Sequence, residues 1–294
     1  MQDIKVAVIG LDTSHAIEFP RRMQAPDCPA DQKVAGLRAV NCLRFETPFQ
    51  NEDGLTARQK TLEGWGVKVT RSFDEAVAGC DALMLEINDP AYHWEYFQKC
   101  VKLGKPMFLD KPLADTTANG RKIVELAKDK QAKVFSTSSV RFTPQVAQAC
   151  AQMPAPLFAQ AYGPLGAAPA GSGIVWYGVH TFEILERAMG RGARSVWSKK
   201  DAAGVTCIVD YPDARRGVVE LNLGAWVWGG CLRTKEKAVP FVADMTRGYS
   251  DLLLEVGKFF RGGPAPVALD DTLEVMALLD AAQRSADSGR EESL

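Results

Sequence analysis

Short apolar runs alternate with helix-like segments along the first half of the chain. Apolar runs of four to eight residues that stop at glycine or a polar turn are typical of buried parallel strands, and the segments between them carry helix-capping residues and lengths. The predicted strands are residues 5–9, 33–40, 67–70, 82–87, 106–109 and 133–136, and the predicted helices are residues 13–23, 72–78, 90–103 and 117–130. This alternation predicts an α/β fold with a Rossmann-type, doubly wound parallel sheet.

The pattern changes after about residue 150. Proline and glycine punctuate residues 154–173, which predicts a loop-rich stretch. The predicted elements beyond it are a helix at residues 178–189, strands at 194–198, 204–210 and 217–223, and closing helices at 250–260 and 270–286. We therefore expect two domains, a Rossmann-type dinucleotide-binding domain over residues 1–145 and an α+β domain for substrate binding and oligomerisation over residues 146–294.

Composition and charge narrow the class of protein. The chain has 294 residues with 46% hydrophobic and 24% charged side chains, as expected of a globular protein with a sizeable core. A net charge of −1 gives no support for nucleic acid or an acidic membrane as partner. The chain enters its first predicted strand almost directly, so we expect no secretory leader, and no apolar run is long enough to span a bilayer. The seven cysteines are widely spaced and no CxxC motif occurs, so we expect no metal site. We also expect reduced thiols in a cytoplasmic protein.

Two residues carry the candidate chemistry. Lys111 follows a predicted strand within Asp110-Lys111-Pro112, at the strand end where open α/β sheets bind ligands. His180 follows the glycine-rich stretch of the second half and opens a predicted helix. Lysine and histidine side chains can together hold a substrate hydroxyl and move its proton. This pair is useful to an enzyme that oxidises alcohols.

Six segments stand in one order along the chain. They are the Gly10 turn after the first strand, the strand-loop-helix at residues 81–104 with His93, residues 105–114 with the Asp-Lys-Pro signature, residues 141–144, residues 178–185 with His180, and residues 285–290. In this order they resemble the Gfo/Idh/MocA family of sugar and inositol oxidoreductases. The resemblance covers nearly the whole chain, although the second domain is short for the family.

The resemblance implies NAD or NADP in the first domain and a sugar, polyol or related carbohydrate-like substrate in the cleft. It also implies an open, mostly antiparallel sheet in the second domain, often used to form a homo-oligomer. Lys111 would bind the reacting oxygen and His180 would take or give its proton while hydride moves to the nicotinamide. The expected cofactor-binding residues are Gly10, Asp12, Thr13, Ser14, His15, Arg38, Asn88, His93 and Asp110. The expected substrate-binding residues are Lys111, Trp176, His180 and Arg141.

Three departures from the family pattern qualify this hypothesis. The glycine-rich turn keeps only Gly10 and places Asp12 beside the expected pyrophosphate, where a carboxylate is unfavourable unless it turns away. Our register puts Arg38, and not an acidic residue, near the end of the second strand, which favours NADP over NAD. Trp176 stands one helical turn before His180, where the family often has Asp.

These departures leave alternatives open. The same scaffold can support a cofactor-independent lyase, hydratase or epimerase that uses Lys111 and His180 for proton abstraction, or a non-catalytic binding protein. Structural roles are also open for three sets of residues. His93 can be a helix-start cap and His15 can be a packing residue. The aromatic group Trp176, Tyr177, Trp226 and Trp228 can belong to the core or to a subunit interface.

Overall fold

The computed structural model describes residues 2–294. These residues form two compact units, each made of several chain segments. Among these described residues, unit 1 comprises 2–114, 121–136 and 249–269, and unit 2 comprises 115–120, 137–248 and 270–294. This division differs from the single boundary that we expected after residue 145, because a late segment of the chain returns to unit 1.

A six-stranded sheet forms the centre of unit 1. Its strands are β1 (Ile4–Ile9), β2 (Leu37–Leu43), β3 (Lys68–Thr70), β4 (Ala82–Leu85), β5 (Met107–Leu109) and β6 (Val134–Ser136). Their order is β3-β2-β1-β4-β5-β6 and all neighbours are parallel. This is the strand order of a Rossmann fold, with the topological switch point between β1 and β4. The predicted fold class is confirmed.

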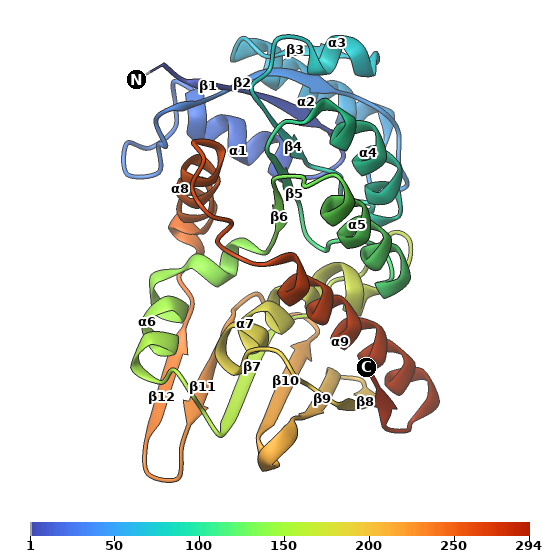
Figure 1. Cartoon of the computed structure of the whole chain (residues 1–294), viewed down its shortest axis with the longest axis vertical. Helices are drawn as coiled ribbons and strands as arrows, with labels where there is room; N and C mark the ends of the chain where they lie inside the picture. The colour runs from blue at the N-terminus through green and yellow to red at the C-terminus, as the bar shows by residue number, and fades with distance from the viewer. Residues whose placement is uncertain (1) are drawn as a thin grey trace. The chain divides into compact units, whose positions relative to one another are not determined.

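Helices cover both faces of this sheet. They are α1 (His15–Gln24), α2 (Glu52–Gly64), α3 (Phe73–Val77), α4 (His93–Cys100), α5 (Thr117–Asp129) and α8 (Gly248–Phe260). In Figure 1, α1 and α8 lie on one side of the sheet and α4 and α5 lie on the other. Strands β4, β5 and β6 and the second half of β1 are accordingly buried, and β1, β4 and β5 therefore consist mainly of continuous apolar runs.

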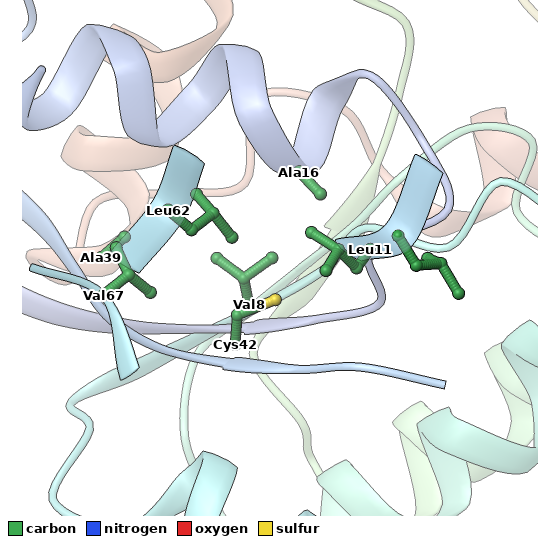
Figure 2. Close-up of a cluster of buried hydrophobic side chains, with 8 residues drawn as sticks. Val8, Leu11, Ala16, Ala39, Cys42, Leu62 and Val67 are labelled. Atoms are coloured by element: carbon green, nitrogen blue, oxygen red, sulfur yellow. The ribbon is translucent and has the colours of Figure 1, made fainter. Parts of the chain in front are cut away.

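A cluster of small and branched apolar side chains fixes α1 and α2 on β1 and β2. Its buried members are Val8, Leu11, Ala16, Ala39, Cys42, Leu55, Leu62 and Val67. Figure 2 shows these side chains between the helix above and the strands below. Each loses most of its contact with water, and full burial of a Val or Leu side chain stabilises a fold by about 1.5–3 kcal/mol. This cluster therefore holds the turn between β1 and α1 in place.

Two predictions in unit 1 were wrong. The second strand was predicted at residues 33–40, but β2 runs over Leu37–Leu43. Gly36 has a φ of +85°, so the chain turns there, and the apolar Val34 belongs to that turn and not to the strand. The helix α2 was not predicted, because its apolar periodicity is weak and only Leu55 and Leu62 are buried along it.

A seven-stranded sheet forms unit 2. Its strands are β7 (Phe158–Pro164), β8 (Ser195–Asp201), β9 (Gly204–Asp210), β10 (Arg216–Asn222), β11 (Gly229–Arg233), β12 (Ala238–Val242) and β13 (Glu292–Ser293). The order is β12-β11-β7-β10-β9-β8-β13, and only β7 and β10 are parallel to each other. The mostly antiparallel sheet expected in this half is confirmed.

Three helices belong mainly to unit 2, α6 (Pro144–Gln152), α7 (Val179–Met189) and α9 (Leu269–Ser288). A π-helical segment, Ile174–Gly178, leads directly into α7. The helix α7 packs on β7 and β10. Gly217 of β10 permits this contact, since a Cβ there would lie 2.7 Å from Leu185. No helix among residues 2–294 is both long and apolar enough to cross a membrane.

Candidate active site

Gly10 forms the turn between β1 and α1. Its φ is +110°, which strongly favours glycine, and a Cβ there would lie 2.2 Å from the carbonyl oxygen of Glu86. The glycine therefore allows the turn to pass directly over the end of β4. This is the one family glycine that the chain keeps, and the structure gives it a steric reason.

The carboxylate of Asp12 is turned into the protein. One oxygen accepts a hydrogen bond from the Asn88 amide at 2.8 Å, and the other accepts from the Thr47 hydroxyl at 2.7 Å and from the Asp89 amide at 3.3 Å. Arg58 donates to the carbonyl of the preceding Leu11 at 2.9 Å. The carboxylate thus ties the loop after β4 to the turn after β1. The Asp12 carboxylate is therefore satisfied by hydrogen bonds within unit 1.

The residues that follow form the amino end of α1. Thr13 is buried and its hydroxyl accepts a hydrogen bond from the His15 amide at 3.2 Å. Ser14 is the exposed N-cap residue, and its side chain makes no capping hydrogen bond. A helix of this length has a partial positive charge at its amino end and amides that suit a phosphate. Ser14 is therefore placed to contact an anion there.

The basic residue at the carboxyl end of β2 is Arg44. The predicted register was wrong, because Arg38 is exposed near the amino end of β2, paired with Lys5 of β1. Arg44 is buried and bonded to the side chains of Glu52, Gln59 and Thr56. Arg44, and not Arg38, therefore occupies this end of β2, and its guanidinium is held by side chains of α2.

Asn88 and His93 lie in and after the loop that follows β4. Asn88 is partly exposed beside the Asp12 turn. His93 is fully buried, with Nε2 2.8 Å from the Ile87 carbonyl and Nδ1 3.3 Å from the Leu113 carbonyl. His93 was expected among the cofactor-binding residues, but both ring nitrogens are committed to backbone oxygens. Its place favours a structural role, linking the segment after β4 to the segment after β5.

Asp110 and Lys111 directly follow β5, and both are buried. One oxygen of Asp110 lies 2.7 Å from Nδ1 of His15, and the other accepts from the Lys111 amide at 2.8 Å. Burial by itself raises the pKa of Asp110. The charges of His15 and Lys111 together with these hydrogen bonds outweigh burial and hold that pKa below its ordinary value. Asp110 is therefore ionised.

Glu86 is a third acidic residue at this end of the sheet, directly after β4. Its side chain is completely buried, and neither carboxylate oxygen has a hydrogen-bond partner among the described residues. Burial, followed by the charge of Asp110, raises the pKa of Glu86 well above its ordinary value, and the charge of Lys111 acts in the opposite direction. Glu86 was not singled out from the sequence, because it lies within the predicted strand at residues 82–87 like an ordinary strand residue.

In unit 2, His180 lies in the first turn of α7. Its Nδ1 is 2.6 Å from Oγ of Ser138, and Ser138 in turn accepts from the Val140 amide at 3.3 Å. This contact at Nδ1 sets the orientation of the imidazole ring. Ser138 thus holds the imidazole in the absence of the carboxylate that the family often places one turn earlier. Sequence reasoning missed it because it lies 42 residues before its partner.

Glu183, one turn after His180, belongs to a buried ionic network. Its carboxylate accepts from the Thr137 hydroxyl at 2.9 Å and from Arg141 at 3.0 Å, and Arg141 also forms an ion pair of 2.6 Å with Glu186. Burial raises the pKa of both glutamates, and Arg141 opposes that rise. Arg141 was expected to bind substrate. With its guanidinium held between two carboxylates, it is placed as a structural residue.

Aromatic rings surround His180 in unit 2. Tyr177 lies 5.0 Å and Trp228 lies 5.6 Å from the imidazole, between ring centroids, and both are edge-on to it. Trp226 contacts Tyr177 at 5.5 Å and is 65% exposed. Trp176 lies 5.2 Å from Tyr177. These rings form one group around the candidate base, which we call the aromatic group. Its exposed member Trp226 is unusual for core packing.

One protein-family model matches part of the chain. The model of the Gfo/Idh/MocA family, described as an oxidoreductase family with an NAD-binding Rossmann fold, matches residues 4–138. This match contains Gly10, the loop after β4 and Lys111. No curated protein matches the sequence at a significant level.

Solved structures resemble the chain over its whole length. Myo-inositol dehydrogenase from Lactobacillus casei, in complex with NAD(H) and myo-inositol, has a TM-score of 0.81 at 13% identity, covering 100% of this chain and 97% of its own. Scyllo-inositol dehydrogenase from the same organism, with NAD(H) and scyllo-inositol, has a TM-score of 0.78 at 13% identity, covering 99% of each chain. GenD2 from gentamicin A biosynthesis, in complex with NAD, has a TM-score of 0.79 at 16% identity, covering 100% and 97%. At these identities the likeness shows the fold.

Proposed function

We propose that this chain is a member of the Gfo/Idh/MocA family of oxidoreductases, whose model matches residues 4–138, and that it is an NAD(P)-dependent dehydrogenase of a polyol, sugar or related hydroxy compound. The observation that carries the proposal is the pair of candidate acid–base residues. Lys111 is buried at the carboxyl end of β5, where Rossmann folds bind ligands, and His180 is held through Nδ1 by Ser138.

The residues of unit 1 fit a dinucleotide. Gly10 keeps the turn tight, and the carboxylate of Asp12 is satisfied by the loop after β4, so it does not oppose a pyrophosphate. The amino end of α1 and the exposed Ser14 suit an anion. Asn88 borders this turn. Arg44 lies at the carboxyl end of β2, but its guanidinium is bound to Glu52, Gln59 and Thr56, so this position does not select between NAD and NADP.

Lys111 is the proposed acid–base residue of unit 1, and His180 is the proposed acid–base residue of unit 2. In the oxidative direction, the ammonium group of Lys111 donates a hydrogen bond to the reacting hydroxyl oxygen and stabilises the negative charge that develops there. In unit 2, His180 is the proposed group that takes or gives a proton, and Ser138 orients its ring through Nδ1. The bound nicotinamide supplies the hydride acceptor.

The aromatic group supports a carbohydrate-like substrate. The C–H faces of a sugar or cyclitol ring are apolar and pack well on aromatic rings, whereas its hydroxyls need polar partners. Trp226 offers an exposed ring beside Tyr177, which contacts His180. Trp176, which stands where the family often has Asp, extends the same group. We propose that these rings hold the substrate against the base.

We also propose that the sheet of unit 2 forms a homo-oligomer. The side of β10 that contains Gly217 faces α7, so the alternate residue Val218 points to the opposite face. On that face, Trp197, Ile208 and Val218 are cross-strand neighbours on β8, β9 and β10. Trp197 is 42% exposed. An apolar row of this kind is typical of a subunit interface.

The test is turnover of a panel of cyclitols, aldoses and sugar acids, followed by the absorbance of the reduced nicotinamide. The proposal predicts dehydrogenation of at least one compound with NAD or NADP, and loss of about 100-fold or more in kcat in Lys111→Met and in His180→Ala. Lys99→Met, on the exposed face of α4, is the matched control. Proton exchange or elimination without a nicotinamide cofactor would contradict the proposal.

A further inference from the structure

His15, Glu86 and Asp110 form a compact buried cluster in unit 1. One imidazole nitrogen and one oxygen from each carboxylate all lie within 4.8 Å of one another. The residues come from three elements, the first residue of α1 and the residues directly after β4 and β5. The cluster is therefore fixed by the core of the sheet and not by a mobile surface loop.

The hydrogen bonds of the cluster are incomplete. His15 Nδ1 lies 2.7 Å from Asp110 and 4.0 Å from Glu86. Glu86 is fully buried, yet neither of its carboxylate oxygens has a hydrogen-bond partner among the residues that the structure describes. Burying a carboxylate without partners is costly, and proteins relieve that cost with a proton or a cation. An unsatisfied side chain directed at two other metal-ligating groups points to a missing cation.

Charge also favours a cation. Glu86 and Asp110 place two buried acidic side chains beside His15, with one ligand atom of each residue within 4.8 Å of the others. Their carboxylates would concentrate negative charge at this point. A divalent ion bound by these groups would offset that charge and satisfy Glu86.

We infer that His15, Glu86 and Asp110 bind a divalent transition-metal ion of the Zn²⁺ or Mn²⁺ type. One imidazole and two carboxylates suit such ions, whereas the absence of thiolates at this cluster disfavours the softer ones. Metal–ligand bonds of about 2.0–2.2 Å place ligand atoms roughly 3–3.5 Å apart. The present separations of 2.7 and 4.0 Å bracket that spacing. The proposal revises the expectation from the sequence that there is no metal site.

Three protein ligands leave at least one coordination position for water or another ligand. The ring of Tyr249, from α8 within unit 1, packs edge-on against His15 at 5.0 Å between centroids. That contact, together with Phe19 at 5.3 Å, limits how far the imidazole can turn. The site is thus positioned by the packing of aromatic rings as well as by the strands.

The test uses the full chain, stripped with a chelator and titrated with Co²⁺. Cobalt reports its ligands, because thiolate ligation produces intense charge-transfer absorption and nitrogen and oxygen ligation does not. We expect one Co²⁺ per chain with weak visible bands, no charge-transfer absorption from cysteine, and displacement by Zn²⁺. We also expect Zn²⁺ to raise the Tm of the stripped protein.

Variants of single residues test which side chains bind the metal ion. Glu86→Gln keeps the size of the side chain and removes the buried charge, so this variant should fold, and it should bind Co²⁺ about 100-fold or more weakly. His15→Asn should have the same effect. Glu95→Gln, an exposed carboxylate on α4, should bind as the wild type does. Failure of the stripped wild type to bind Co²⁺ or Zn²⁺ at millimolar concentration, or unchanged binding in Glu86→Gln, would overturn the assignment. Neither result depends on whether the protein is a dehydrogenase.

Discussion

His180 and Ser138 are joined through imidazole Nδ1 and hydroxyl Oγ at 2.6 Å. Both residues lie in unit 2, and the serine belongs to the segment that leads from β6 into a short 3-10 turn at Ser139–Phe142. The contact defines the orientation of the candidate base without a carboxylate. Ser138 is therefore a positioning residue.

Removing this contact should impair proton transfer more than substrate binding. We expect Ser138→Ala to lower kcat about 10-fold and to change KM little, because a misoriented base mainly affects the transition state. The pH profile of kcat should shift as well, which a merely structural loss would not cause. Ser139→Ala, the next residue, is the control. An unchanged pH profile in Ser138→Ala would show that the contact does not orient the base.

Gly10 should tolerate no side chain. Gly10→Ala places a Cβ 2.2 Å from the Glu86 carbonyl at a φ of +110°, so we expect a loss of roughly 3 kcal/mol or more in the free energy of unfolding and weaker dinucleotide binding. Gly79→Ala separates the cost of the positive φ from the cost of the steric clash. Gly79 has a φ of +65°, but no atom lies within 4 Å of the new Cβ. Its cost should be about 1–2 kcal/mol, measured by urea unfolding. Equal losses would refute the steric argument.

Arg141 should matter for stability in a pH-dependent way. Arg141→Met leaves Glu183 and Glu186 buried without their cation, which should cost about 3–5 kcal/mol near neutral pH. Both glutamates have raised pKa values, so the folded state binds more protons than the unfolded state above the ordinary pKa of a glutamate. The free energy of unfolding therefore increases as pH falls through that interval.

We accordingly expect the loss in free energy of unfolding caused by Arg141→Met to become smaller between about pH 7 and about pH 5. Without the arginine, Glu183 and Glu186 take up protons at a higher pH than they do in the wild type. Urea unfolding at several pH values measures this. Arg191→Met is the matched control, since Arg191 forms an exposed pair with Asp271 that should contribute about 1 kcal/mol or less. A deficit in Arg141→Met that grows as pH falls would contradict the account.

The apolar row on the sheet of unit 2 predicts self-association. Light scattering during gel filtration should find the wild type as an oligomer, and Val218→Lys should shift it to a smaller species because a charge is placed among apolar side chains. Leu254→Lys is the control, an exposed apolar residue on α8 of unit 1. A monomeric wild type at the same concentrations would remove the basis for the proposed interface.

The sequence predicted the elements whose signal is local. The apolar runs of β1, β4 and β5 were found because strands covered on both faces need no alternation, and Lys111 was found because it directly follows such a run. The strands β11 and β12 were missed because Gly229, Gly230 and Pro240 resemble loop residues. Only their pairing with β7 and with each other gives them strand structure.

The contacts of the site were less predictable than its residues. His15, Glu86 and Asp110 are separated by 71 and 24 positions in the sequence, and they meet because β4 lies between β1 and β5 in the sheet. A local sequence pattern does not reveal the order of the strands in the sheet. Arg38 was misplaced for a related reason, because the turn at Gly36 moves the start of β2 beyond the first apolar residues.

The most direct test of the proposed activity is calorimetric titration of the cofactor-stripped protein with NAD and NADP in oxidised and reduced forms. The account predicts micromolar binding of at least one form. Absence of binding of every form at millimolar concentration would contradict the central claim that this chain is a nicotinamide-dependent oxidoreductase.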